Sequence, residues 1–136
     1  MPAMESRLSM MSLGVKDLKA SRRFYSEGLG FVERRQTNAF IVFYDLGAMT
    51  LSLYPEEKLA AEVEMPANGE GFRGFTLSHN LRTEQEVDQL ISAAVLAGAR
   101  LIKRASRADW GGYSGYFSDP DGFLWEVATG SFLDPD

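Results

Sequence analysis

The feature that most constrains this chain is an internal repeat. Alternating apolar side chains predict a strand at residues 8–15, followed by a helix for which Asp17 is a suitable N-cap. Three more strands follow, and the order of one strand, one helix and three strands begins again near residue 75, where residues 83–86 have a capping-box sequence. Neither half has enough chain to bury both faces of its own sheet. The repeat therefore predicts one α+β domain over residues 1–136, in which two similar halves pair.

The two halves have definite expected bounds. We expect a first module at residues 7–55, a short helix and linker at residues 56–71, and a second module at residues 72–130. In the alignment of the halves, Leu13-Gly14-Val15 corresponds to Leu77-Ser78-His79, and Leu51-Ser52-Leu53 corresponds to Trp125-Glu126-Val127. The expected strands are residues 8–15, 31–36, 40–45, 49–54, 75–79, 101–104, 113–118 and 124–128.

Composition and charge exclude several classes of protein. With 14 basic and 19 acidic residues, a formal net charge of −5 and no run of Lys and Arg, the chain is not expected to bind nucleic acid. The absence of cysteine excludes a disulfide framework, a thiolate metal site and a cysteine nucleophile. Residues 1–11 lack the layout of a signal peptide, and no apolar stretch approaches the length of about 18 residues typical of a membrane helix. We therefore expect a cytoplasmic protein without membrane contact.

Three segments resemble one known family. Residues 13–31 are similar to the opening strand, helix and helix exit of the vicinal-oxygen-chelate (VOC) superfamily of glyoxalases, bleomycin-resistance proteins and extradiol dioxygenases. Residues 72–77 resemble the opening of its second module, and residues 116–126 (Tyr-Phe-Ser-Asp-Pro-Asp-Gly-Phe-Leu-Trp-Glu) resemble its closing hairpin. The similarity extends over residues 8–129. It implies two βαβββ modules that form a curved mixed sheet around a concave cleft.

The closing hairpin also has a physical basis of its own. Pro120 fixes φ for a tight turn, Asp119 can accept hydrogen bonds from nearby amides, and Gly122 tolerates a positive φ. In the strand that follows, Trp125 and Glu126 must point to opposite faces of the sheet. If Trp125 packs under the helices, the carboxylate of Glu126 lies on the concave face, where it requires a partner or a function.

The resemblance implies where a divalent metal would bind. The family's ligands lie on the first and last strands of each module, and the matching positions in this chain are Met10, Ser52, Gly74 and Glu126. Only Glu126 can bind such an ion as an anion, because a thioether suits soft ions, a hydroxyl is a weak ligand and glycine has no side chain. A catalytic zinc ordinarily has three protein ligands and a water. We therefore predict neither a metal nor another cofactor.

Two further side chains are candidates for chemistry. His79 is the only histidine, and Val15, its counterpart in the first half, faces the helices. His79 is therefore either a strand-end residue bonded to a neighbour or, if the alternation breaks, a ligand or base. The spacing of Tyr116 and Glu126 resembles a signature of extradiol dioxygenases, in which the tyrosine contacts substrate and the glutamate binds iron. The upstream histidine of that signature is missing near residues 107–109. Tyr116 is either a ligand contact or an aromatic packed in the sheet.

The loop at residues 108–115 is rich in glycine and aromatic residues. Its backbone can approach a ligand while Trp110 and Tyr113 stack on that ligand, and the face of the Trp110 ring can hold a cation. Alternatively, the glycines only relieve crowding at the edge of the sheet.

Three functions are consistent with these residues. The first is a metal-free protein, expected from the resemblance to be a homodimer, that binds a small organic molecule in the cleft. The second is an enzyme: a metal-dependent lyase, isomerase or dioxygenase in which His79 and Glu126 hold one ion, or a metal-free enzyme with Glu126 and Tyr116 as catalytic candidates. The third is an interaction module whose cleft is filled by aromatic side chains. The predicted ligand-binding residues are Met10, Ser52, Tyr54, Trp110, Tyr116 and Glu126.

Overall fold

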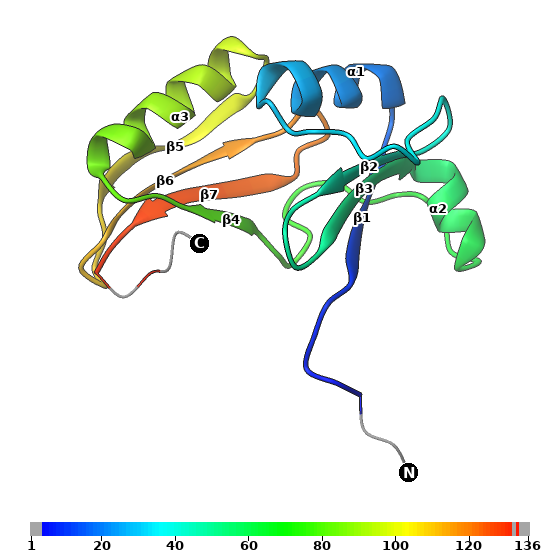
Figure 1. Cartoon of the computed structure of the whole chain (residues 1–136), viewed down its shortest axis with the longest axis horizontal. Helices are drawn as coiled ribbons and strands as arrows, with labels where there is room; N and C mark the ends of the chain where they lie inside the picture. The colour runs from blue at the N-terminus through cyan, green and yellow to red at the C-terminus, as the bar shows by residue number, and fades with distance from the viewer. Residues whose placement is uncertain (1–3, 132, 134–136) are drawn as a thin grey trace. The chain divides into compact units, whose positions relative to one another are not determined.

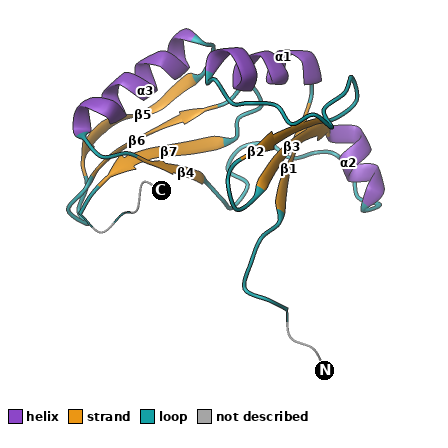
Figure 2. Cartoon of the chain, viewed as in Figure 1, coloured by secondary structure: helices purple, strands orange, loops and turns teal. Residues whose placement is uncertain are grey.

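The computed structural model describes residues 4–131 and residue 133 (Figures 1 and 2). Its elements are, in order, β1 (Met10–Val15), α1 (Leu18–Arg22), the π-helical turn η1 (Arg23–Gly28), β2 (Val42–Asp45), β3 (Thr50–Pro55), α2 (Glu56–Glu62), β4 (Leu77–Asn80), α3 (Glu84–Leu96), β5 (Arg100–Arg107), β6 (Tyr113–Ser118) and β7 (Leu124–Thr129). The strands form two mixed sheets, neither of which is closed, and the predicted α+β class is confirmed. Within the described residues, every helix is too short or too polar to cross a bilayer.

The chain divides into two compact units, each with its own sheet. The first unit contains residues 4–22 and 31–67, and the second contains residues 23–30 and 68–131. The division falls between α1 and η1, so the second part of the first helical segment packs with the second unit. The module bounds inferred from the repeat stay a prediction.

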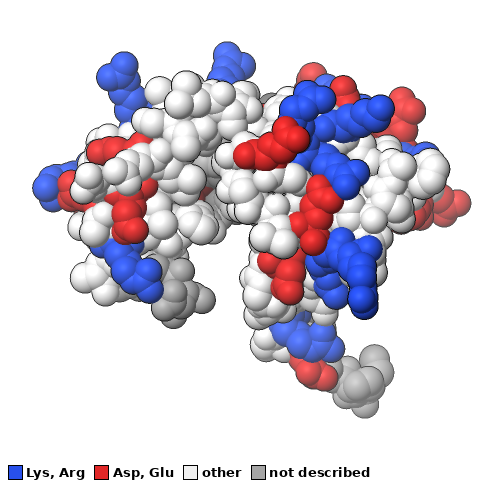
Figure 3. Space-filling model, turned by 45° about the horizontal axis from the view of Figure 1, so that its top comes forward, with Lys and Arg blue, Asp and Glu red and all other residues white. Residues whose placement is uncertain are grey.

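Charged side chains of both signs are interleaved on one face of the molecule. On the face drawn in Figure 3, Lys and Arg lie next to Asp and Glu and do not merge into one basic area. This distribution is what the sequence leads us to expect, because its basic residues are scattered among a larger number of acidic ones.

The sheet of the first unit has the strand order β1-β3-β2. β3 is the central strand, because it pairs with β1 in parallel and with β2 antiparallel. Its residues Leu51, Ser52 and Leu53 are fully buried. α1 packs against β3, while α2 packs against β1 and β3. The helix predicted early in the linker is thus present as α2.

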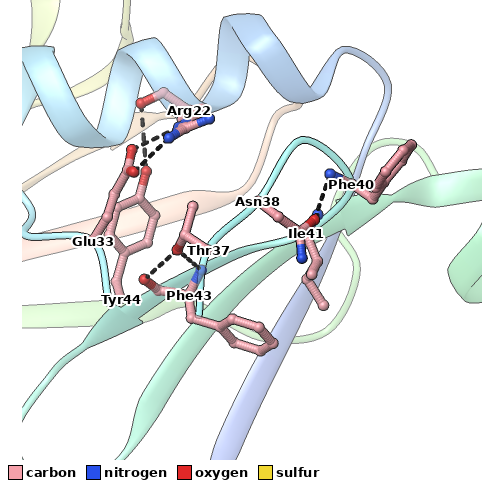
Figure 4. A network of polar contacts seen from close by, with 8 residues as sticks. All are labelled: Arg22, Glu33, Thr37, Asn38, Phe40, Ile41, Phe43 and Tyr44. Atoms are coloured by element: carbon pink, nitrogen blue, oxygen red, sulfur yellow. Dashed lines mark hydrogen bonds and ion pairs between the residues drawn. The ribbon is translucent and has the colours of Figure 1, made fainter. Parts of the chain in front are cut away.

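The strand predicted at residues 31–36 is wrong, because only Glu33 forms a bridge to β2. Thr37 explains the difference. Its hydroxyl accepts a hydrogen bond from the amide of Phe43 at 2.9 Å and donates to the carbonyl of Phe43 at 3.2 Å (Figure 4). The amide of Arg34 also donates to the carbonyl of Phe43 at 2.7 Å, and the amide of Thr37 donates to the carbonyl of Arg34 at 3.0 Å, so the chain turns after residue 34. Beyond that turn a side chain, not a strand backbone, bonds the amide of Phe43. Arg22 anchors the segment through two hydrogen bonds of 2.7 Å to the carboxylate of Glu33.

The sheet of the second unit has the strand order β4-β7-β6-β5, with β4 parallel to β7 and the other pairs antiparallel. α3 covers one face and packs against β6, β7 and β5 (Figure 2). The predicted capping box of Thr83 and Glu86 is present at its start. Gly115 on β6 permits the close approach of α3, because a Cβ there would lie 2.8 Å from Cδ1 of Ile91.

β5 is the outer strand of this sheet and is longer than the predicted strand at residues 101–104. Its pairing with β6 shifts register twice, between Leu101 and Lys103 and again between Lys103 and Ser106. Such shifts mark β-bulges, which change which residues share a face. The alternation of side chains along β5 therefore could not be read from the sequence.

The pairing of strands corrects the alignment of the two halves. In the first unit Ser12 pairs with Ser52, and in the second unit Ser78 pairs with Glu126. With Ser52 and Glu126 taken as equivalent, Ser12 corresponds to Ser78, whereas the sequence alignment assigned Gly14 to that position. A shift of two residues leaves every side chain on the same face of its strand. The inferences about faces are therefore unaffected.

Candidate functional site

The last strand of the second unit separates an apolar face from a polar one. Trp125 and Val127 of β7 are buried, and the ring of Trp125 contacts the rings of Tyr25 and Phe117 on the side covered by η1 and α3. Because adjacent residues of a strand point to opposite faces, Glu126 lies on the other face of the sheet. This is the orientation that the alternation predicts.

Glu126 lies in a row of polar side chains that crosses three strands. Ser78 on β4 and Tyr116 on β6 are its direct partners in the sheet. The hydroxyl of Tyr116 donates to Oε2 of Glu126 at 3.1 Å, and the hydroxyl of Ser78 donates to Oε1 at 3.2 Å. The structure thus brings together two residues predicted from the sequence, Tyr116 and Glu126, and adds Ser78. We call these three residues the polar row.

The polar row is partly open to solvent. Ser78 is exposed, and Tyr116 and Glu126 are half-buried. Burial, together with the charge and the hydrogen bond of Glu126, raises the pKa of Tyr116, so its hydroxyl remains a donor at neutral pH. Each carboxylate oxygen keeps acceptor capacity beyond the one hydroxyl that it binds. The polar row can therefore accept hydrogen bonds or a positive charge from a ligand.

The pairing of strands extends this row to a fourth residue, Lys103 on β5, which pairs with Tyr116. Directly paired residues of neighbouring strands point to the same face. Lys103 could not be identified from the sequence, because the register shifts on either side of it hide the alternation. Ser78 could have been found, since a residue next to a helix-facing His79 must face the other way.

Three of the predicted ligand-binding residues belong to the first unit. Ser52 is fully buried, and its hydroxyl donates to the hydroxyl of Ser12 at 2.7 Å. Met10 is 45% exposed at the start of β1, and Tyr54 is half-buried near the end of β3. That these side chains share one pocket with those of the second unit stays a prediction.

Trp110 packs against its own loop. A Cβ at Gly112 would overlap the Trp110 ring, and a Cβ at Gly130 would lie 2.9 Å from Cζ3 of that ring. The glycines therefore make room for an indole that is 40% exposed, which is the structural alternative considered for this loop. Tyr113 donates its hydroxyl to Oδ1 of Asp88 on α3 at 2.7 Å. Neither aromatic side chain is part of the polar row.

The residues present do not fit the metal centre that the resemblance implies. Gly74 precedes β4 with a φ of +86° and has no side chain to offer, and the hydroxyl of Ser52 bonds to another hydroxyl. His79 follows Ser78 on β4, so it points to the face opposite Glu126 and cannot bind the same ion. Across residues 4–131 and residue 133, no three histidine, aspartate or glutamate side chains are arranged to hold a metal.

A buried network fixes the turn that leads into β7. Oδ1 of Asp119 accepts from the amides of Asp121 and Phe123 at 2.9 Å each, as the turn sequence predicts. Its Oδ2 accepts from the hydroxyl of Tyr25 at 2.6 Å, and that hydroxyl accepts from Nε1 of Trp125 at 3.0 Å. Burial raises the pKa of Asp119 and raises the pKa of Tyr25 well above its ordinary value. The network holds β7, and with it the polar row, against η1.

Residues 7–127 match the model of the Glyoxalase/Bleomycin resistance protein/Dioxygenase superfamily. A glyoxalase-related enzyme from Fulvimarina pelagi is 34% identical, with a TM-score of 0.83 over 92% of this chain and 88% of its own. No protein of curated function is significantly similar to this chain.

Two further solved structures are similar in fold. A hypothetical protein from S. aureus is 26% identical, with a TM-score of 0.80 over 94% of this chain and 96% of its own. A glyoxalase/bleomycin resistance protein/dioxygenase family enzyme from Burkholderia phytofirmans is 22% identical, with a TM-score of 0.80 over 89% of this chain and 96% of its own. At that identity the second similarity concerns the fold alone.

Proposed function

The chain belongs to the Glyoxalase/Bleomycin resistance protein/Dioxygenase superfamily, and we propose that it binds a small organic molecule at the polar row without the family's metal centre. The observation that carries this proposal is the carboxylate of Glu126, which is half-buried on one face of the sheet and accepts hydroxyls from two neighbouring strands. These two hydrogen bonds fix the position of the carboxylate. A fixed carboxylate with spare lone pairs is suited to orient a ligand.

The absence of suitable partner ligands supports a metal-free site. Of the four positions that correspond to the family's ligands, only Glu126 carries an anionic side chain. Because His79 lies on the opposite face of β4, it does not complete a set with Glu126. The metal-dependent lyase, isomerase or dioxygenase that the sequence left open would need ligands of another kind. We therefore do not propose the metal-dependent enzyme, and the first experiment below tests for it.

That experiment measures metal content. The purified protein is dialysed against Zn²⁺, Ni²⁺, Mn²⁺ or, without oxygen, Fe²⁺, and the metal bound per chain is measured. The same measurement is made on Glu126→Gln and on the control Glu57→Gln, which removes the same charge from an exposed position on α2. We expect substoichiometric metal that is the same in all three proteins. One equivalent of metal that is lost only in Glu126→Gln would overturn the metal-free proposal and support the metal-dependent enzyme.

A second experiment tests ligand binding with n-hexylamine as the probe. Its ammonium group can donate to Glu126, and backbone amide NMR shifts report where it binds. We expect saturable shifts at Ser78, Tyr116 and Glu126, weaker binding to Glu126→Gln and unchanged binding to Glu57→Gln. Shifts that appear only far from the polar row would contradict the assignment of the site.

Two other expectations stay predictions beside this proposal. Light scattering after size exclusion would test the homodimer expected from the resemblance, since a monomer at high micromolar concentration would contradict it. The cytoplasmic location, inferred from the sequence, would be tested by fractionation of cells that express the chain.

A further inference from the structure

We infer that the polar row and Lys103 together bind a zwitterionic small molecule, with its cationic group at Glu126 and its anionic group at Lys103. The inference rests on the proposed function and adds the chemical class of the ligand. Its basis is the order of side chains across neighbouring strands: a carboxylate on β7, a phenol on β6 and an ammonium on β5.

The first step places Lys103 on the same face as Tyr116. The two residues are paired in the β5–β6 ladder, and paired residues share a face. The opposite face gives independent support. A groove of about 330 Å³ between α3 and β5 is lined from β5 by Leu101, Arg104 and Ala105. Lys103 does not line this groove on the α3 side, which agrees with its placement beside Tyr116.

The second step concerns charge. Lys103 is exposed, and among the described residues its ammonium group forms no ion pair or hydrogen bond, although its backbone belongs to the β5–β6 ladder. Tyr116 lies between Lys103 and Glu126 in the row and bonds to Glu126 alone. The polar row and Lys103 together therefore present one positive group, Lys103, and one negative group, Glu126, separated by the ring of Tyr116.

The third step concerns spacing and selectivity. Neighbouring strands lie about 4.8 Å apart, so β5 and β7 are separated by roughly 10 Å at the backbone, and the flexible stem of a lysine can shorten the gap between the charges. A ligand with a short apolar chain between its two charged ends fits this arrangement. A purely anionic ligand would be repelled by Glu126 and a purely cationic one by Lys103, so the row favours a molecule that carries both charges.

The experiment compares three probes of similar length: 6-aminohexanoate, n-hexylamine and hexanoate. Dissociation constants are measured by NMR titration for the unmodified protein, Lys103→Gln, Glu126→Gln and the control Lys19→Gln, which removes the charge of an exposed side chain on α1. For probes this small we expect constants on the order of 1–10 mM, with 6-aminohexanoate bound about three- to fivefold more tightly than n-hexylamine.

The variants separate this inference from the proposed function. Lys103→Gln should abolish the advantage of 6-aminohexanoate over n-hexylamine and leave n-hexylamine bound at least as tightly, whereas Lys19→Gln should change neither. If n-hexylamine binds at Glu126 but the carboxylate of 6-aminohexanoate adds no affinity, the zwitterion inference is wrong and the proposed function stands. If no probe shifts the amides of the polar row, the proposed function fails as well.

Discussion

The two units use the same position of their sheets in different ways. In the first unit the parallel pair of first and last strand places Ser12 beside Ser52, and the hydroxyl of the fully buried Ser52 donates to Ser12. In the second unit the corresponding pair is Ser78 and Glu126, which stays partly exposed and also bonds to Tyr116. The same ladder position thus holds a pair of hydroxyl groups in one unit and presents a charge in the other.

The outer strands widen this difference. In the first unit, Thr37 bonds the backbone of Phe43, and no regular fourth strand forms beside β2 within the described residues. In the second unit β5 pairs along β6 and adds Lys103 to the row. A repeat in sequence therefore need not repeat chemistry, because a strand that forms in one half can be cut short by a turn in the other, together with the functional groups that it would carry.

The largest expected effect tests whether the second unit depends on its buried network. Tyr25→Phe removes a hydroxyl that donates to Asp119 and accepts from Trp125, so two buried polar groups each lose this hydrogen bond. We expect the free energy of unfolding to fall by about 2–4 kcal/mol. Urea denaturation measures it. The control Tyr54→Phe removes a half-buried hydroxyl of the first unit. If it lowered the unfolding free energy as much as Tyr25→Phe does, the buried network would contribute no more to stability than an ordinary tyrosine hydroxyl.

The next effect compares glycines at helix–sheet contacts of the two units. In Gly115→Ala the new methyl group would lie 2.8 Å from Cδ1 of Ile91 and from the backbone nitrogen of Ala105, and we expect a loss of about 1–3 kcal/mol in unfolding free energy. In Gly14→Ala the nearest atom is Cα of Glu56 at 3.1 Å, so the loss should be smaller. Thermal or urea unfolding of both variants shows which one loses more unfolding free energy. Equal losses in the two variants would contradict the prediction.

A smaller effect compares the equivalent serines directly. Ser52→Ala removes a buried hydroxyl that is bonded to Ser12, which should cost about 0.5–1.5 kcal/mol of unfolding free energy. Ser78→Ala removes an exposed hydroxyl beside Glu126 and should cost less than about 0.5 kcal/mol. The reverse order in urea denaturation would mean that Ser78 is a structural residue and not part of a ligand site.

The smallest effect concerns the titration of Tyr116. Its pKa is raised by burial, by the negative charge of Glu126 and by the hydrogen bond to that carboxylate. Glu126→Gln removes the charge that opposes formation of the phenolate, so the pKa of Tyr116 should fall toward its ordinary value while burial keeps part of the shift. NMR of tyrosine ring carbons between pH 8 and about 12 measures this titration. An unchanged pKa would show that the two side chains do not interact in solution.

Local signals predicted much of the fold. The capping box at Thr83, the turn at Asp119 and the alternation around Trp125 each depend on residues close together in the chain, and each is found in the structure. The same alternation identified the face of Glu126, and the structure places Tyr116, a candidate taken from the resemblance to the family, in contact with it. The predictions from the capping box, the turn and the alternation succeeded because neighbouring residues determine the geometry.

The remaining features depend on contacts that sequence spacing does not record. Tyr25 and Asp119 are 94 residues apart, and the sequence around each residue contains no signal that the two side chains are in contact. The strand expected at residues 31–36 is cut short by a turn in which the amide of Thr37 donates to the carbonyl of Arg34, and Thr37 is a residue type equally suited to a strand. Lys103 could not be assigned to a face because two bulges flank it.

The bulged outer strand has a further consequence for how this protein behaves in concentrated solution. An open strand edge exposes unpaired amides and carbonyls that can recruit other chains into a growing sheet, and bulges and cationic side chains discourage this. β5 has two register shifts and carries Arg100, Lys103, Arg104 and Arg107. We therefore expect the strand that supplies a charge to the proposed site also to discourage aggregation, so that variants that neutralise several of these cations precipitate at lower concentrations than the unmodified chain.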